Sequence, residues 1–116
     1  MVGDHVATGG VVGIHQFCRI GSYSMVAGGS MVAQDVAPFT MVHGNRAKTR
    51  GLNVVGLKRS DYSNEDKKSI KEIYRYLFKE GDLFEKSLEN IKSNIPESEL
   101  KNIYLDFFSK SKRGLC

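Results

Sequence analysis

The chain has 116 residues, of which 41% are hydrophobic, and a net charge of +4, enough for one ordinary domain with a modest core. No stretch approaches the roughly 20 apolar residues that span a bilayer, and the first residues do not follow a signal-peptide pattern. Cys18 and Cys116 lie too far apart for metal-ligand spacing. We therefore expect a cytoplasmic protein with no metal or cofactor.

Residues 1–43 carry a six-residue repeat. Every sixth residue from the second is β-branched, and the residue after it is small in five of six cases, His15 being the exception. A period of six fits neither a helix nor a plain amphipathic strand. It predicts short strands joined by tight corners, three of which make one coil of a parallel β-helix. The inward-pointing positions are Val2, Thr8, Ile14, Ile20, Val26 and Val32.

In this interpretation the small residues let the backbone turn, and six hexads give about two coils. The repeat is already in phase at residue 2, and repeat folds need about three units and a terminal cap. We therefore expect further coils upstream of residue 1, or coils supplied by another chain. The competing interpretation is a Gly-rich antiparallel β domain.

Pro38 ends the repeat. Residues 39–42 have strand character, Gly44 and Asn45 form a turn, and "GLNVVGLKR" after residue 50 is typical of a short helix. Residues 44–62 therefore form a connecting segment between the β-helix at 1–43 and a helical domain at 63–116.

Three helices are predicted in residues 63–116. The first begins at a capping box of Ser63 and Asp66 and ends at Gly81. The second covers about residues 84–93, and the third follows Pro96. Apolar residues recur at helical spacing and are expected to form a core rather than a ligand site: Ile70, Ile73, Tyr74, Leu77, Phe78, Leu88, Ile91, Leu100, Ile103, Tyr104, Phe107 and Phe108.

Charge divides the chain. Residues 1–43 have a net charge of −1 and residues 44–116 a net charge of +5. The lysines are spread among acids without an aromatic stacking platform, which argues against nucleic acid as a partner. The second half of the chain is thus predicted to be a basic helical region.

His15 and Gln16 interrupt an otherwise apolar repeat. The residue after an inward aliphatic points outward, so this pair would lie in a cleft between subunits if several chains packed their faces together. From the periodicity alone, a surface His and Gln at a corner is the favoured interpretation.

Several motifs together point to one family. They are "GG" five residues ahead of "HQF", then "QDVAPF", "GNRA", "GLNVVGLKR" and a helical tail ending in "KRG". With the hexads, they resemble the UDP-N-acetylglucosamine O-acyltransferases of lipid A synthesis over the full length of the chain. The resemblance implies a homotrimer of left-handed parallel β-helices, each followed by a small α-helical C-terminal domain.

The implied reaction moves an (R)-3-hydroxyacyl group from acyl carrier protein to the 3-position of UDP-N-acetylglucosamine. A histidine general base deprotonates the acceptor hydroxyl, which attacks the thioester. In the family this base lies about two coils before "HQF", which places it before residue 1. His5 aligns with a different hexad position and does not substitute. The resemblance therefore implies no catalytic residue in this chain and an inactive isolated chain.

The remaining motif residues are implied to bind substrate. His15 and Gln16 would contact the sugar and acyl groups, while Asn53 and Arg59 would hold the nucleotide end, where a guanidinium suits phosphate. Gly28 matches the position that limits acyl-chain length.

Arg46, Val55 and Ser60 depart from residues common in the family. These positions leave open whether the acceptor is a hydroxyl or an amine. Two alternative functions also stay open: a non-catalytic trimeric β-helix module, and another hexapeptide acyltransferase that uses acetyl-CoA.

Overall fold

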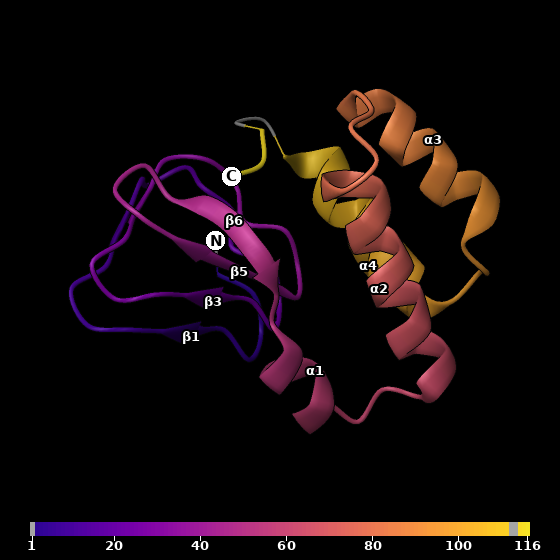
Figure 1. The fold of residues 1–116 in the computed structure, drawn as a ribbon, viewed down its shortest axis with the longest axis horizontal. Helices are drawn as coiled ribbons and strands as arrows, with labels where there is room; N and C mark the ends of the chain where they lie inside the picture. Colours follow the sequence, from indigo (N-terminus) through magenta and orange to yellow (C-terminus); the bar gives the residue numbers. More distant parts are fainter. Residues whose placement is uncertain (1, 112–113) are drawn as a thin grey trace. The chain divides into compact units, whose positions relative to one another are not determined.

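The computed structural model describes residues 2–111 and 114–116 (Figure 1). The chain divides into two compact units: Met1–Ser60 with Asp106–Cys116, and Asp61–Leu105. The first contains the strands and a short helix, and the second is helical. Among the described residues, no helix has both the length and the apolar character needed to cross a membrane.

Short strands in two sheets build the first unit. They are β1 (Ala7–Thr8), β2 (Gly13–Ile14), β3 (Met25–Val26), β4 (Met31–Val32), β5 (Thr40–His43) and β6 (Lys48–Leu52). Helix α1 (Val54–Arg59) follows β6. Figure 1 shows β1, β3, β5 and β6 side by side, in the order of the four-stranded sheet. The second face pairs β2 with β4.

The pairing shows that the chain winds in coils. Val2 pairs in parallel with Ile20, and Ile20 with Val36, on the third face. β1, β3 and β5 are likewise parallel neighbours. The chain thus returns to each face after one coil, as the six-residue repeat predicts. The hairpin of β5 and β6, which is antiparallel, ends the winding.

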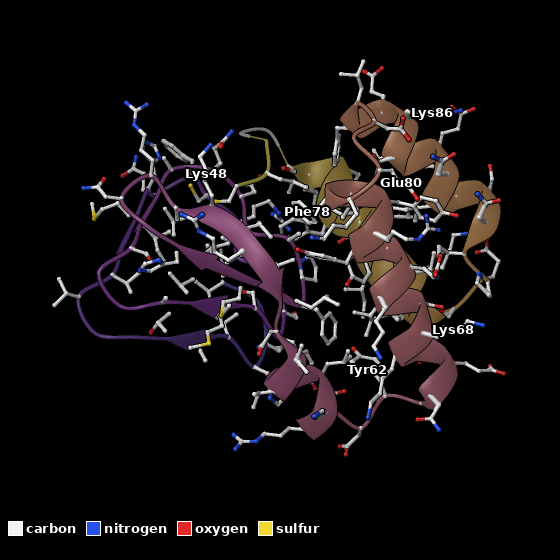
Figure 2. The ribbon with its side chains drawn as sticks, in the orientation of Figure 1. Lys48, Tyr62, Lys68, Phe78, Glu80 and Lys86 are labelled. Carbon is white, nitrogen blue, oxygen red and sulfur yellow. The ribbon has the colours of Figure 1, made fainter. Side chains whose placement is uncertain are left out.

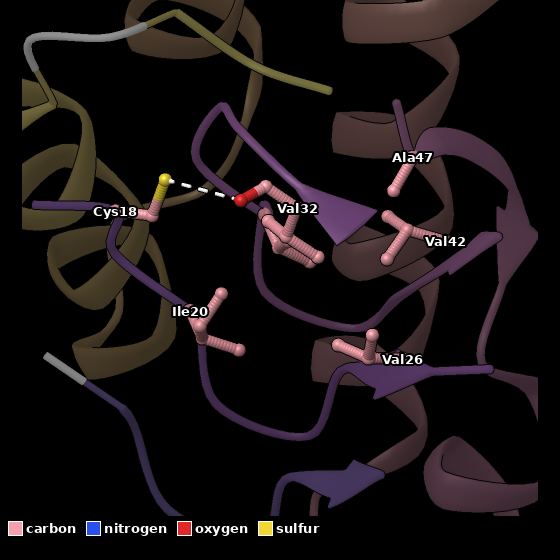
Figure 3. Packing of buried hydrophobic residues seen from close by; sticks show 7 residues of the cluster. Cys18, Ile20, Val26, Val32, Val42 and Ala47 are labelled. Atoms are coloured by element: carbon pink, nitrogen blue, oxygen red, sulfur yellow. Dashed lines mark hydrogen bonds between the residues drawn. The ribbon is translucent and has the colours of Figure 1, made fainter. Parts of the chain in front are cut away.

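Aliphatic side chains fill the inside of these coils (Figure 3). Ile20, Val26 and Val32 are buried, as predicted, whereas Val2 is 61% and Ile14 is 38% exposed. Val2 and Ile14 belong to the first coil, which has a neighbouring coil on one side only in this structure. Cys18 also points inside, with its thiol 3.8 Å from the carbonyl oxygen of Val32.

The predicted reason for the small residues was wrong. Gly9 and Gly21 do not have positive φ angles. A Cβ atom at Gly9 would instead lie 2.4 Å from the nitrogen of Gly28, and one at Gly21 would lie 2.4 Å from the nitrogen of Pro38. Small residues are therefore needed because adjacent coils approach closely. The left-handed residues at the corners are others: His5, Val11, Tyr23, Gly29 and Phe39.

The three predicted helices are present. They are α2 (Asn64–Phe78), α3 (Phe84–Asn94) and α4 (Glu99–Lys110). The Ser63 hydroxyl accepts the Asp66 N–H at 3.1 Å, which caps α2 as predicted. Ile103 was wrongly assigned to the core, since it is 42% exposed. The buried members of the predicted core are Ile70, Ile73, Ile91, Leu100, Tyr104, Phe107 and Phe108.

Candidate functional site

The "HQF" motif forms a turn directly after β2. The His15 N–H donates to the Val32 carbonyl at 2.8 Å. The Cys18 N–H donates to the His15 carbonyl at 2.9 Å, which closes the turn. Because Cys18 is buried in the coil interior, the turn holds His15, Gln16 and Phe17 on the outside, where all three are exposed. The corner therefore exposes an imidazole, an amide and an aromatic ring side by side.

Asn53 occupies a different place, at the start of α1. Its side chain is almost completely buried. The Nδ2 atom donates to the Tyr23 carbonyl at 2.8 Å, while Oδ1 accepts the Gly56 N–H at 3.1 Å and caps the helix. Its backbone N–H donates to the Phe39 carbonyl at 2.8 Å. Asn53 thus fastens α1 to two corners of the winding, a role that the sequence analysis missed although Asn is a preferred N-cap residue.

Arg59 is the last residue of α1 and is exposed. Its guanidinium has no ion pair within the described part of the chain. The helix beneath it is anchored by Leu57, which is buried, and by the Ser60 hydroxyl, which donates to the Leu57 carbonyl at 2.7 Å. Arg59 is therefore a free charge carried on a helix that Asn53 and Leu57 hold in place.

Gly28 lies at the corner after β3. A Cβ atom there would lie 3.1 Å from the Gly10 carbonyl oxygen, and the adjacent Gly29 N–H donates to the carbonyls of Gly10 and Val11 at 3.0 Å. The close approach of two coils is a structural reason for glycine at this position. Its predicted effect on acyl-chain length stays a prediction.

The predicted site residues form two separate groups in this chain. His15 and Gln16 lie in the turn after β2, and Asn53 and Arg59 lie on α1 after β6. Within residues 2–111 and 114–116, no hydrogen bond or ion pair joins the two groups. Nor do three His, Cys, Asp or Glu side chains gather there in a metal-binding arrangement.

The segment that contains the second group carries five exposed cations, one of which is Arg59 itself. Residues 44–60 contain five basic residues and no acid, and we call these five the basic strip: Arg46, Lys48, Arg50, Lys58 and Arg59. Lys48 of β6 is labelled in Figure 2. By contrast, residues 61–105 contain eight basic and ten acidic residues. The predicted basic region is therefore placed differently along the chain. Residues 44–60 sum to +5, residues 61–105 to −2 and residues 106–116 to +2, so the excess positive charge lies in the connecting segment rather than in the helices.

Residues 35–116 match the family described as "Udp N-acetylglucosamine O-acyltransferase; Domain 2". The chain is 40% identical over 112 residues to the acyl-(acyl-carrier-protein)–UDP-N-acetylglucosamine O-acyltransferase of Nautilia profundicola, covering 97% of this chain and 43% of the relative. It is 41% identical over 116 residues to that of Aliarcobacter butzleri, with the same coverage.

Two solved structures resemble the whole chain. The UDP-N-acetylglucosamine acyltransferase of Bacteroides fragilis superposes with a TM-score of 0.91 at 30% identity, over 99% of this chain and 45% of that one. The Moraxella catarrhalis enzyme gives 0.88 at 41% identity, over 97% and 44%. The chain thus spans less than half the length of these relatives. On the family match to residues 35–116, the chain belongs to the UDP-N-acetylglucosamine O-acyltransferase family.

Proposed function

We propose that the chain is the C-terminal part of an enzyme that moves an (R)-3-hydroxyacyl group from acyl carrier protein to the 3-position of UDP-N-acetylglucosamine, the first step of lipid A synthesis. The observation that carries the proposal is the match along 97% of the chain to relatives named for these two substrates. A left-handed winding and a homotrimer belong to the same proposal.

In this assignment the catalytic base is a histidine outside residues 1–116. His5 is not a candidate, and its ring is stacked on Tyr23 with 4.6 Å between the ring centroids. His15 and Gln16, exposed at their turn, would bind the sugar and acyl groups. The Arg59 guanidinium would make charge-assisted hydrogen bonds to phosphate. Asn53 would act by holding the helix that carries Arg59.

The trimer proposal draws support from apolar side chains left outside the winding. Val11 is 92%, Phe17 is 69% and Met31 is 49% exposed. Packing between copies would cover these side chains and enclose the His15 turn in a cleft between subunits. Sedimentation at micromolar concentration tests this: a monodisperse monomer would contradict it.

The basic strip is the proposed contact for acyl carrier protein, which is acidic. Five exposed cations with no acid among them attract such a partner at long range, and the attraction weakens as salt rises. This moves the expected docking surface from the helices to residues 44–60.

The decisive assay supplies acyl carrier protein loaded with an (R)-3-hydroxyacyl chain together with UDP-N-acetylglucosamine. We expect no product from the 116-residue chain, and product from a polypeptide in which the upstream coils of a relative precede it. Product from the 116-residue chain would contradict the proposal that the catalytic histidine lies outside this chain. An inactive long polypeptide would favour the non-catalytic module, and transfer from acetyl-CoA would favour the acetyltransferase alternative.

In the active polypeptide, Arg59→Ala should raise a Michaelis constant more than it lowers turnover, because the contact is remote from the reacting atoms. A lost charged hydrogen bond costs about 1.5–3 kcal/mol, or roughly ten- to hundredfold in kcat/KM. Lys71→Ala, which removes an exposed charge from α2, is the control and should leave kcat/KM unchanged. Equal kinetics for the two variants would contradict the role of Arg59.

A further inference from the structure

Three aromatic residues stack at one corner of the winding. His5, Tyr23 and Phe39 occupy this corner in successive coils, and all three are left-handed, with φ angles of 56°, 60° and 61°. The ring centroids of His5 and Tyr23 lie 4.6 Å apart. Those of Tyr23 and Phe39 lie 4.9 Å apart, with the two rings almost parallel at 3°. We call these three residues the aromatic column.

The left-handed conformation in the column needs support from the rings. Only Gly, and less often Asn or Asp, adopts this conformation routinely, because a Cβ atom crowds the backbone there. Stacked aromatic pairs are favourable beyond the apolar area that they bury, and Phe39 is only 1% exposed. The stacked rings therefore help to hold Tyr23 and Phe39 in a conformation that their backbones would otherwise avoid.

The carbonyl groups of the same two residues hold Asn53. The Tyr23 carbonyl accepts a hydrogen bond from Asn53 Nδ2 at 2.8 Å, and the Phe39 carbonyl accepts one from the Asn53 backbone N–H at 2.8 Å. The N–H groups of Tyr23 and Phe39 donate to the preceding coil, at the Asp4 carbonyl (2.8 Å) and the Ser22 carbonyl (3.0 Å). Since these N–H groups are fixed, a change of φ at either corner would swing its carbonyl away from Asn53.

Asn53 passes this placement on to α1. Its Oδ1 atom accepts the Gly56 N–H at 3.1 Å, and its carbonyl accepts the Leu57 N–H at 2.9 Å. A Cβ atom at Gly56 would lie 2.5 Å from Asn53 Nδ2, so the amide fits closely against the first turn. Arg59 ends the helix, about 9 Å along its axis from Asn53. A displaced cap would therefore displace the guanidinium with the helix.

We propose that Tyr23 and Phe39 are positioning residues for the substrate contact of Arg59. Their stacked rings keep both corners left-handed, which aims two carbonyls at Asn53, and Asn53 in turn fixes α1. This inference rests on the proposed function, in which the Arg59 guanidinium binds a substrate phosphate.

Amide hydrogen exchange of the 116-residue chain tests the structural step without any enzymatic activity. Tyr23→Ala removes the ring but keeps a Cβ atom, so we expect the Gly56 and Leu57 amides to exchange about three- to tenfold faster, the effect of one lost hydrogen bond. Tyr23→Phe keeps the ring and should restore the parental exchange. His5→Ala is the matched control, because His5 belongs to the column but is neither of the two residues whose carbonyls hold Asn53. Unchanged exchange in Tyr23→Ala, or equal acceleration in His5→Ala, would overturn the proposal.

Kinetics of the active polypeptide test the functional step. Tyr23→Ala should raise the same Michaelis constant as Arg59→Ala, by about three- to tenfold, and leave kcat within about twofold of the parent. A role in folding alone would instead lower the folded fraction, and with it the apparent kcat, at an unchanged Michaelis constant. Because both residues act through one contact, the variant that combines the two substitutions should be no weaker than Arg59→Ala. An unchanged Michaelis constant in Tyr23→Ala, or losses that multiply in the combined variant, would contradict the proposal.

Gly56→Ala tests the same contacts if Tyr23→Ala does not fold. The added Cβ atom displaces the Asn53 amide, whereas alanine itself favours a helix, so a weaker α1 could not explain a loss. We expect the same Michaelis constant to rise by a similar factor, and a parental value in the folded variant would count against the proposal. An inactive parent polypeptide would refute the proposed acyl transfer, and the exchange rates of Gly56 and Leu57 would still decide whether the aromatic column holds α1.

Discussion

Ser111 donates its hydroxyl to the carboxylate of Asp35, 76 positions earlier in the chain. Asp35 is completely buried, and its other carboxylate oxygen accepts the Arg19 N–H at 2.7 Å. Its backbone N–H donates to the Gly114 carbonyl, and its carbonyl accepts the Cys116 N–H, both at 2.8 Å. One aspartate thus joins two coils and also holds the end of the chain, through an isolated parallel bridge to Leu115.

Asp35→Ala should destabilise the first unit strongly, because it leaves the part-buried Arg19 N–H and Ser111 hydroxyl without their acceptor. A hydrogen bond to a charged group contributes about 1.5–3 kcal/mol. Ser111→Ala removes one of the two and should cost less. Urea unfolding of both variants and of the double variant measures their coupling. Asp106→Ala, at an exposed position, is the control, and additive losses at positions 35 and 111 would contradict the contact.

Gly9 and Gly10 form a matched pair for testing the close approach of coils. A Cβ atom at Gly9 would lie 2.4 Å from a backbone nitrogen, whereas one at Gly10 would meet nothing within 4 Å, and neither residue has a positive φ. Gly9→Ala should therefore destabilise by about 1–3 kcal/mol through overpacking. Gly10→Ala should be neutral or stabilise by up to about 1 kcal/mol through the unfolded chain. The unfolding temperatures of the two variants test this prediction. Equal shifts of the two unfolding temperatures would show that the coils move apart to accommodate the Cβ atom at position 9.

These glycines also show what the sequence can predict. The period of six was sufficient to predict the winding, because inward aliphatics must recur once per face. It could not tell whether a small residue serves a turn or a close contact, since both requirements select glycine. The left-handed corners at Val11, Tyr23 and Phe39 were also unpredictable, because residues with a Cβ atom seldom adopt that conformation.

At the candidate site too, the sequence singles out residues without showing what their side chains contact. Motif resemblance singled out Asn53 and Arg59, but only the structure shows that the Asn53 amide is used within the chain. Strand β6 was missed because its sequence, "KTRGL", is polar and contains a glycine. It pairs with β5 through the turn at Gly44, whose φ is 116°, and this hairpin carries three residues of the basic strip.

Lys101 should be essential to the corner between α3 and α4. Lys101→Met keeps most of the volume but leaves the carbonyls of Lys92 and Ile95 without their donor. An abandoned buried acceptor costs about 1–3 kcal/mol, so unfolding monitored by helical circular dichroism should shift clearly to lower urea concentration.

Lys92→Met is the control for this substitution, because Lys92 is exposed and contributes a backbone carbonyl rather than its side chain. Its midpoint should stay close to that of the parent. Similar midpoints for the two methionine variants would mean that water replaces the Lys101 ammonium at no cost.

The Cys116 thiol should be alkylated slowly in the folded chain. Burial raises the pKa of its thiol to about 11, and the Sγ atom donates to the Gln34 carbonyl at 3.3 Å. Only the thiolate is alkylated, so iodoacetamide should modify the native Cys18→Ala variant slowly at pH 8 and faster as pH approaches 11. The same variant in denaturant should show the ordinary rise near pH 8.5. Equal native and unfolded rates at pH 8 would contradict the burial.

The same shift has a consequence for stability. Because the folded pKa of Cys116 lies above the unfolded one, folding favours the neutral thiol. That contribution is fully present below the unfolded pKa and is lost as pH rises through the folded value of about 11. The unfolding temperature of the parent should therefore fall more steeply between pH 9 and 11 than that of Cys116→Ala, which has no thiol to ionise. Parallel curves for the two proteins would mean that Cys116 ionises as easily in the folded chain as in the unfolded one.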